Sequence, residues 1–432
     1  QGSAGIGEFL VIFCMTEKLL QYIWQFQYFN RTSLETSTAE TLQIIHPGQA
    51  NTNQGPDFLN ARIRIGDTFL AGSIELHIKT SDWDKHRHQF DKNYSNVILH
   101  VVYQHDINSS GLPVLELAPR VSNILLERYE RLMHGSDLIP CGKGISQVKE
   151  ITLAAWKERL LAERLTRKAA AIVDLLHHSN HHWEEVCWWL IARHFGSQVN
   201  QDAFESIARS IPLSLLAKHK HQIHQLEALL FGQAGLLDQD FTEAYPKLLQ
   251  REYQFLQHKY QLQKAVIPVQ FLRMRPGNFP TIRLAQLAML IHTISHLFSK
   301  ILEATSLDEL KALFKLCAND YWHYHYRFDE PSEYKIKNLG TDMIDHIIIN
   351  AVCPLLFAYG LFHSQESFKI KSLSWLEETL AESNRITKKF KQLSLEISSA
   401  FDSQAFIELN NSYCTPKRCL QCSIGVSLLK QE

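Results

Sequence analysis

The 432-residue chain has almost no net charge, because 44 Lys and Arg residues offset 45 Asp and Glu residues. A globally basic nucleic-acid-binding protein is thereby excluded, although a local basic patch is not. Cysteine is sparse and unevenly spread, with eight in all, which is unlike a disulfide-stapled secreted domain. No apolar run reaches the roughly 20 residues that a membrane-spanning helix needs. We therefore expect a cytoplasmic protein that has no membrane segment.

Two common phosphate and ester chemistries also lack their motifs. There is no P-loop, which argues against ATP hydrolysis, and no Gly-x-Ser-x-Gly nucleophile elbow. The apolar run Phe9–Cys14 is short and lacks the basic flank of a signal peptide. Met15 is a natural start, so residues 1–14 are interpreted as a tag remnant or an upstream extension.

The region before residue 145 is dominated by strand patterns. Ala61–Ile65 and Thr68–Lys79 flank a Gly66-Asp67 turn, which is typical of a hairpin, and two further strands follow at 96–103 and 112–117. A helix over Thr16–Phe29 precedes the strands. The pattern predicts a mixed-sheet α/β domain over residues 15–145.

After residue 150 the apolar residues recur at helical spacing almost to the end of the chain. The sequence therefore predicts an α+β protein. The mixed-sheet domain is followed by a larger all-α region at 146–410 and by a cysteine-containing tail at 411–432 that packs on the helical domain.

The most informative side chains lie on the second arm of the hairpin. Successive residues of a strand face opposite sides, so Glu75, His77 and Lys79 share one face. Asp57 stands 18 residues before Glu75, at the mouth of the neighbouring arm. Three ionisable groups in a row could mark a surface strand, but with Asp57 beside them a catalytic interpretation fits better.

Two carboxylates so placed can hold a hard divalent cation such as Mg²⁺ or Mn²⁺. The expected metal ligands are Asp57 and Glu75, with Glu17 of the first helix as a third. Such a cation polarises a phosphoryl oxygen and lowers the pKa of a bound water, and His77 or Lys79 would orient that water. The chemistry expected is metal-assisted hydrolysis.

These residues resemble the PD-(D/E)XK nuclease superfamily. Pro56-Asp57 matches the first half of its motif, and Glu75-Leu76-His77 matches the second half with His in the lysine position. Lys79 is one pleat further along the same face. The resemblance, over residues 16–120, implies a metal-dependent nuclease acting on DNA or RNA. The alternative is an inactive nucleic-acid-binding or scaffold protein, which the missing lysine at position 77 favours.

The chain as a whole also resembles an uncharacterised bacterial family known as a domain of unknown function. This resemblance implies the domain layout and no activity. The segments that carry it are Gly55–Asn60, Glu75–His88, Asn96–Val102, Glu227–Leu236, Arg275–Gln286 and Asn411–Gly425.

A polar segment follows the strand and contains further candidates. His86 and His88 are interpreted as catalytic proton carriers or phosphate contacts at the rim of the site. The competing interpretation is a solvated loop with incidental histidines. His100 lies on an apolar strand, so we expect a buried histidine whose ring is hydrogen-bonded.

The tail has three cysteines, Cys414, Cys419 and Cys422, in a C-x₄-C-x₂-C spacing. Thiolates at this spacing can bind Zn²⁺ or an iron–sulfur cluster. A closed site needs a fourth ligand, and Cys353 is the expected one, with Cys317 or a histidine as other possibilities. The alternative is a reduced tail that binds no metal.

Overall fold

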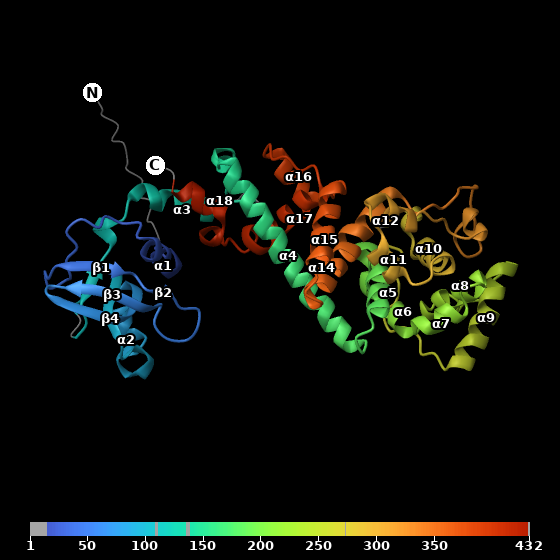
Figure 1. The fold of residues 1–432 in the computed structure, drawn as a ribbon, viewed down its shortest axis with the longest axis horizontal. Helices are drawn as coiled ribbons and strands as arrows, with labels where there is room; N and C mark the ends of the chain where they lie inside the picture. The colour runs from blue at the N-terminus through green and yellow to red at the C-terminus, as the bar shows by residue number, and fades with distance from the viewer. Residues whose placement is uncertain (1–14, 109–110, 135–138, 273, 431–432) are drawn as a thin grey trace, which may run out of the picture. The chain divides into compact units, whose positions relative to one another are not determined.

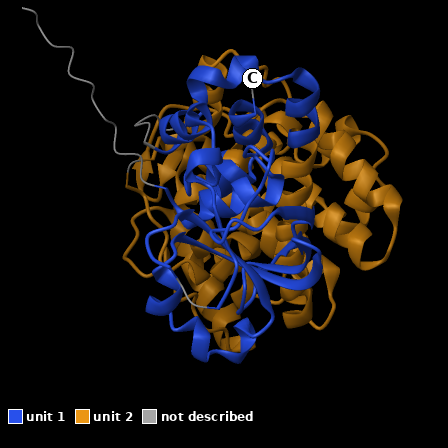
Figure 2. Ribbon diagram, turned by 90° about the vertical axis from the view of Figure 1, so that its left-hand side faces the viewer, with its two compact units in different colours: residues 1–156, 410–432 blue, residues 157–409 orange. Residues whose placement is uncertain are grey.

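The computed structural model describes residues 15–108, 111–134, 139–272 and 274–430. The chain divides into two compact units, coloured separately in Figure 2: residues 1–156 with 410–432, and residues 157–409. The tail therefore belongs with the N-terminal region, whereas the sequence predicted that it packs on the helical domain. The boundary also falls about ten residues later than expected. Residues 1–14, the expected tag or extension, lie outside the described residues.

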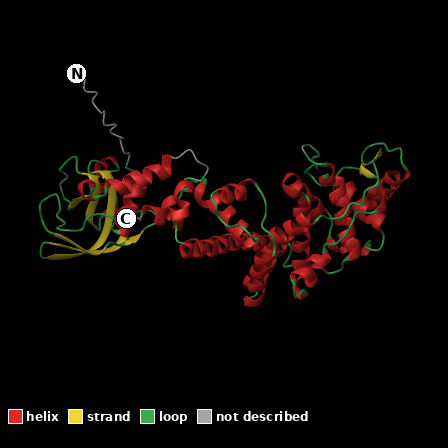
Figure 3. Ribbon diagram, turned by 90° about the horizontal axis from the view of Figure 1, so that it is seen from above, coloured by secondary structure: helices red, strands yellow, loops and turns green. Residues whose placement is uncertain are grey.

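The first unit is built on a six-stranded mixed sheet (Figures 1 and 3). The strand order is β1-β3-β4-β5-β6, and β2 pairs with β3. The β1-β3-β4 part is antiparallel, and β5 and β6 continue parallel to β4. The strands are β1 (Leu42–His46), β2 (Gln49–Ala50), β3 (Phe58–Ile65), β4 (Thr68–Lys79), β5 (Val97–Gln104) and β6 (Val114–Glu116).

The helices of this unit are mostly short. They are α1 (Glu17–Phe26), α2 (Asp82–Lys85), α3 (Asn123–His134), the first turns of α4 (Glu150–His178) and α18 (Ser423–Leu429). Single turns of 3₁₀ or π geometry join them: η1 (His88–Phe90), η2 (Lys92–Tyr94), η3 (Ala118–Arg120), η4 (Gly142–Gln147), η8 (Asn410–Cys414) and η9 (Cys419–Gln421).

Local sequence explains the elements beside the strand that carries Glu75. The Thr16 hydroxyl accepts the backbone N–H of Leu19 at 3.2 Å and caps α1 as expected. The apolar stripe of α1, which includes Leu19 and Ile23, is buried, and α1 contacts β4. Strand β4 is buried from Ser73 to His77 on both faces. The polar face of β4 is therefore covered rather than open to bulk water.

The second unit is helical, apart from a small hairpin of β7 (His325–Arg327) and β8 (Glu330–Pro331). Its helices, besides the rest of α4, are α5 (Trp183–Phe195), α6 (Ser197–Ser210), α7 (Leu213–Lys218), α8 (Ile223–Gln233), α9 (Ala244–Tyr260), α10 (Pro280–Thr293), α11 (Leu297–Glu303), α12 (Leu307–Leu313), α13 (Thr341–Ile347), α14 (Cys353–Phe362), α15 (Glu366–Glu378), α16 (Arg385–Gln392) and α17 (Ala400–Leu409), with short turns η5 (Pro276–Asn278), η6 (Asp320–His323) and η7 (Ile348–Val352). The fold is thus α+β, as predicted.

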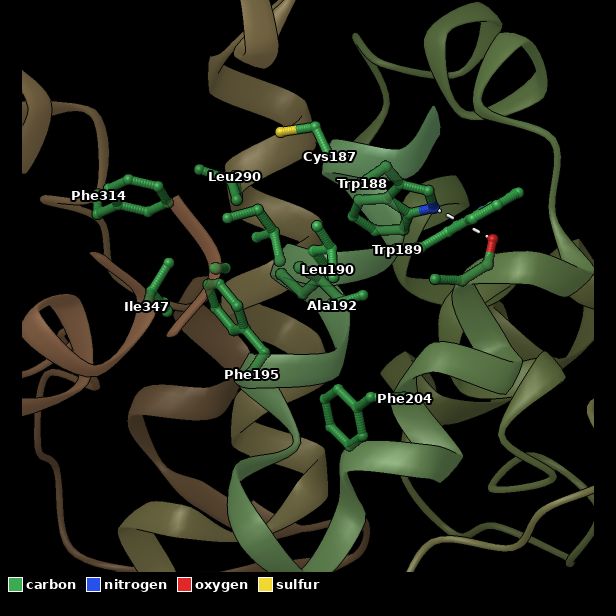
Figure 4. Close-up of a cluster of buried hydrophobic side chains, with 14 of the residues drawn as sticks. Cys187, Trp188, Trp189, Leu190, Ala192, Phe195, Phe204, Leu290, Phe314 and Ile347 are labelled. Atoms are coloured by element: carbon green, nitrogen blue, oxygen red, sulfur yellow. Dashed lines mark hydrogen bonds between the residues drawn. The ribbon is translucent and has the colours of Figure 1, made fainter. Parts of the chain in front are cut away.

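The core of the second unit surrounds α5, which is buried along most of its length (Figure 4). Trp188 packs there and donates its indole N–H to the carbonyl oxygen of Ala208 at 3.2 Å. One continuous helical stretch, Thr341–Phe362, is long and apolar enough to cross a membrane. Two thirds of its most apolar window is buried inside the protein, as expected for a core helix.

The close approach of α8 and α9 predicts a large effect of a small substitution. A Cβ atom on Gly232 would overlap the ring of Tyr253. We expect Gly232→Ala to lower the free energy of unfolding of the helical unit by about 2–3 kcal/mol. Denaturant unfolding checks this. Gly277→Ala, where a Cβ meets no atom within 4 Å, is the control and should change stability little.

Candidate active site

Asp57 and Glu75, predicted from separate hairpin arms, meet in the structure. The backbone N–H of Asp57 donates to Glu75 Oε2 at 3.0 Å. Asp57 Oδ2 in turn accepts the backbone N–H of Leu76 at 3.0 Å, and Asp57 Oδ1 accepts the Gln21 amide at 2.8 Å. The contact follows from the antiparallel pairing of β3 and β4, in which Phe58 lies opposite Ile74. The structure therefore places Asp57 and Glu75 next to each other, and their role as metal ligands stays a prediction.

Burial makes this pair of carboxylates electrostatically unfavourable. Desolvation, followed by repulsion from Asp57, raises the pKa of Glu75 to about 8. Desolvation also raises the pKa of Asp57 to about 6, although hydrogen bonds from Leu76 and Gln21 oppose the rise. Glu17 adds to the repulsion on both groups. A cation between the carboxylates would remove this cost.

Two histidines face the remaining oxygen of Glu75, and a third contacts one of them. Glu75 Oε1 lies 3.6 Å from the Nε2 atoms of both His77 and His88, and His77 Nε2 lies 3.1 Å from His86 Nδ1. One ligand atom from each of the three rings lies within 4.8 Å of the others, which is close enough for all three to bind one metal ion. The structure therefore brings His88 to Glu75 and His86 to His77, both from the segment after β4.

A fourth histidine, on the neighbouring strand β5, forms a hydrogen bond with this cluster. His77 Nδ1 is 2.9 Å from His100 Nε2 on the neighbouring strand. Desolvation, reinforced by the surrounding imidazoles, lowers the pKa of His77 to about 3 and that of His100 to about 4. Both rings are therefore neutral at pH 7. His100 is buried and hydrogen-bonded, as predicted.

Sequence reasoning missed two groups of the site. Gln21 on α1 holds Asp57, and the ring of Tyr94 stacks on His88 with 3.8 Å between centroids. Desolvation and the two carboxylates raise the pKa of Tyr94 to about 12. No sequence motif marks either residue. Gln21 lies on α1, the helix capped by Thr16, and α1 contacts β4. Trp83 is buried beside the histidines, so its ring packs rather than offering an open stacking surface.

Two predicted site residues are placed less centrally. Lys79 is exposed, and its ammonium group contributes to the lowered pKa of the Asp106 carboxyl. It lies two pleats beyond Glu75, so sharing a face does not bring it to the carboxylates. Glu17 is also exposed, yet its charge acts on both Asp57 and Glu75, which places it at the margin of the site.

A cavity of about 860 Å³ opens beside Asp57 within the first unit. Four cationic residues line it: Lys18, Lys417, Arg418 and Lys430. Among the residues that the structure describes, none of these four cations forms an ion pair with a carboxylate. Lys417 donates to the carbonyl oxygen of Met133, and Arg418 to the amide oxygen of Gln421. The cavity is therefore basic except at Asp57.

The cysteine that lies near the three tail cysteines is not the predicted Cys353. Cys353 is fully buried in the helical unit, where its carbonyl oxygen accepts the Ser372 hydroxyl. In the first unit the tail cysteines have Cys141 nearby, because α18, which follows Cys422, contacts both η4, which follows Cys141, and η9, which begins at Cys419. Sequence reasoning missed Cys141 because it stands 273 residues before Cys414.

Comparison with known proteins identifies the family without an activity. No curated protein and no solved structure matches the chain. A family model described as "Protein of unknown function (DUF2851)" matches residues 17–385, which is most of the chain. The chain therefore belongs to the DUF2851 family, as the resemblance of its segments predicted.

Proposed function

We propose that the first unit is a metal-dependent hydrolase of phosphodiester bonds in nucleic acid. The observation that carries the proposal is that Asp57 and Glu75 lie side by side, with His77 and His88 beside Glu75 Oε1 and His86 beside His77. Buried acids with strongly raised pKa values beside a cavity are typical of functional sites. A purely structural role would not require the half-buried carboxylate of Asp57 to lie beside the buried carboxylate of Glu75.

The donor set fits a divalent cation. Carboxylate oxygens suit Mg²⁺ and Mn²⁺, whereas imidazole nitrogens suit later transition metals such as Zn²⁺. Asp57 and Glu75 would hold the ion, with Glu17 at the margin, and the imidazoles of His77 and His86 favour Mn²⁺ over Mg²⁺. Such an ion polarises a phosphoryl oxygen and lowers the pKa of a bound water.

The remaining steps belong to side chains. His88 is a suitable general base because its Nε2 atom is buried and has no hydrogen-bond partner in the part of the chain that the structure describes. Desolvation and His86 lower the pKa of His88, so that the ring is neutral at pH 7 and can take a proton from the attacking water. Tyr94, stacked on the ring, limits the orientations that His88 can adopt.

Nucleic acid is the substrate class that the cavity favours. Lys18, Lys417, Arg418 and Lys430 present positive charge next to Asp57, and cationic side chains bind phosphate backbones without reading sequence. The phosphates would lie along these cations, with one scissile phosphate at the carboxylates. This arrangement supports DNA or RNA as the partner.

A second candidate is a protein that binds nucleic acid without cutting it. The observation in its favour is that position 77 is histidine and that Lys79 is exposed, away from the carboxylates. No lysine ammonium then stands where the resembled nucleases place one. The two candidates differ in whether the bound divalent ion leads to cleavage.

Cleavage assays test the proposal directly. Full-length protein is incubated with end-labelled single- and double-stranded DNA and RNA in Mg²⁺, Mn²⁺, Zn²⁺ or EDTA. We expect cleavage of at least one substrate with a divalent ion, fastest in Mn²⁺, and none in EDTA. Binding that is equally tight with and without metal, and never followed by cleavage, would instead support the scaffold.

A further inference from the structure

The four cysteines of the first unit form a group from distant parts of the sequence. Cys141 precedes η4, Cys414 ends η8, Cys419 begins η9 and Cys422 precedes α18. All four are free thiols, and each is less than a tenth exposed. Helix α18, which follows Cys422, contacts η4, which follows Cys141, and η9, which begins at Cys419, and η8, which ends at Cys414, contacts η9. A single buried cysteine thiol is common in protein cores, but a group of four buried thiols is not.

The chain is folded tightly around these sulfur atoms. A Cβ atom on Gly425 would overlap the carbonyl oxygen of Cys419, and a Cβ on Gly144 would lie 3.2 Å from Leu428. The backbone N–H groups of Ile424 and Gly425 donate hydrogen bonds to the sulfur of Cys422. Peptide N–H groups aimed at sulfur are the usual surroundings of a metal-bound thiolate.

We propose that Cys141, Cys414, Cys419 and Cys422 bind an iron–sulfur cluster. The spacing of the last three is C-x₄-C-x₂-C, with the fourth ligand far away in the sequence, which is one of the ligand spacings found in iron–sulfur proteins. On binding, each thiol releases its proton to solvent and its sulfur becomes an iron ligand. Iron and sulfide come from cellular cluster assembly or from chemical reconstitution.

The separation of the sulfur atoms favours a cluster over a single zinc ion. Zn–S bonds of about 2.3 Å place the sulfurs of a tetrahedral site roughly 3.8 Å apart. Among the described residues, the three imidazoles are the group whose ligand atoms all lie within 4.8 Å, and no three of these sulfurs meet that condition. In a [2Fe–2S] cluster only two thiolates share an iron atom, and in a [4Fe–4S] cluster each thiolate binds a different one, so no three sulfurs need to lie as close together as they do around one zinc ion.

The cluster would fix the segment that forms one wall of the basic cavity. Pro416, Lys417, Arg418 and Leu420 lie between the cysteine ligands and also line the cavity beside Asp57. The link to substrate binding rests on the proposed function, but the cluster itself does not. Metal content and spectra can therefore establish or exclude the cluster whatever the outcome of the cleavage assays.

Anaerobic purification of the full chain tests the proposal. We expect about two to four iron atoms per chain with matching acid-labile sulfide, and a broad visible absorption band that oxygen or a strong chelator bleaches. Cys141→Ser should abolish the band and the iron. Cys353→Ser, at a buried thiol outside the group, should retain both.

A second measurement covers the case in which Cys141→Ser does not fold. Trypsin can cut after the exposed Lys417 and Arg418 between the cysteines. We expect bleaching of the wild-type protein to speed this cleavage about tenfold, as the tail loosens. Stoichiometric zinc without sulfide, no metal even after reconstitution with iron and sulfide, or a cluster retained in Cys141→Ser but lost in Cys353→Ser would each overturn the proposal.

Discussion

Replacing Asp57 by Asn is expected to slow metal-dependent cleavage of nucleic acid by at least about 100-fold, and Glu75→Gln is expected to do the same. Both substitutions keep the size of the side chain and remove one negative charge from the group that would hold the cation. Loss of metal-based charge stabilisation costs several kcal/mol in the transition state, and each 1.4 kcal/mol is about tenfold in rate. Initial rates in saturating Mn²⁺ measure the effect.

Asp67→Asn provides the matched control. Asp67 lies on the β3–β4 turn of the same sheet, and its side chain is fully exposed beside Arg64. We expect its activity to be within about twofold of wild type, since exposed pairs of this kind contribute little. If Asp57→Asn retains the wild-type rate in the same preparations, the cleavage comes from another protein and the proposed site is wrong.

Stability of the metal-free protein is expected to fall as pH rises from about 5 to about 8. The Glu75 carboxyl has its pKa raised from 4.5 to about 8 in the folded state, so between these values the folded protein holds a proton that the unfolded chain has lost. Stability then decreases with rising pH. The loss in the free energy of unfolding is on the order of 4 kcal/mol, at about 1.4 kcal/mol per pKa unit.

Divalent metal and substitution should both remove this pH dependence. Glu75→Gln cannot ionise, so in the absence of metal it should be more stable than wild type at pH 8 and inactive in cleavage. Adding Mn²⁺ should stabilise wild type and release a proton below pH 8, which calorimetry in buffers of different ionisation enthalpy detects. A flat pH profile for the metal-free wild type, or the same slope in Glu75→Gln, would show that Glu75 is not held protonated by its surroundings.

Stability and activity, measured on the same variant, distinguish a packing residue from a residue of the site. Replacing a residue that only packs in the core should lower the protein's free energy of unfolding. Replacing a residue of a site that holds unfavourable charge should raise the free energy of unfolding and remove the function. The buried acids of the first unit are expected to follow the second pattern. Gly232 in the helical unit is expected to follow the first.

Local sequence was sufficient for the parts of the site that depend on strand geometry. Alternation along Ser73–Lys79 placed Glu75 and His77 on one face, and the Gly66-Asp67 turn brought Asp57 alongside. The α+β class followed from the change of periodicity near residue 145. These features depend on contacts between neighbours in the chain, so a short window of sequence contains them.

Alternation predicts which face a side chain lies on but not how deeply that face is buried. For Lys79 the predicted face is right, but the exposure of the side chain could not be predicted. The pleat puts Lys79 on the same face as Glu75, but burial ends at His77 and the lysine reaches solvent. The segment after β4 shows the converse. His86 and His88 lie on irregular backbone, whose direction no periodicity predicts, and only the return of that segment over β4 brings His88 to Glu75 and His86 to His77.

The sequence by itself determined the strand that carries the acids, the helix cap at Thr16 and the spacing of the tail cysteines, because each is set by residues a few positions apart. Only the tertiary structure decided that Cys141 rather than Cys353 joins the tail cysteines, and that the tail lies with the sheet. The physical reason is that pairing residues hundreds of positions apart depends on which core each segment buries its apolar side chains in, and composition and spacing do not contain that choice.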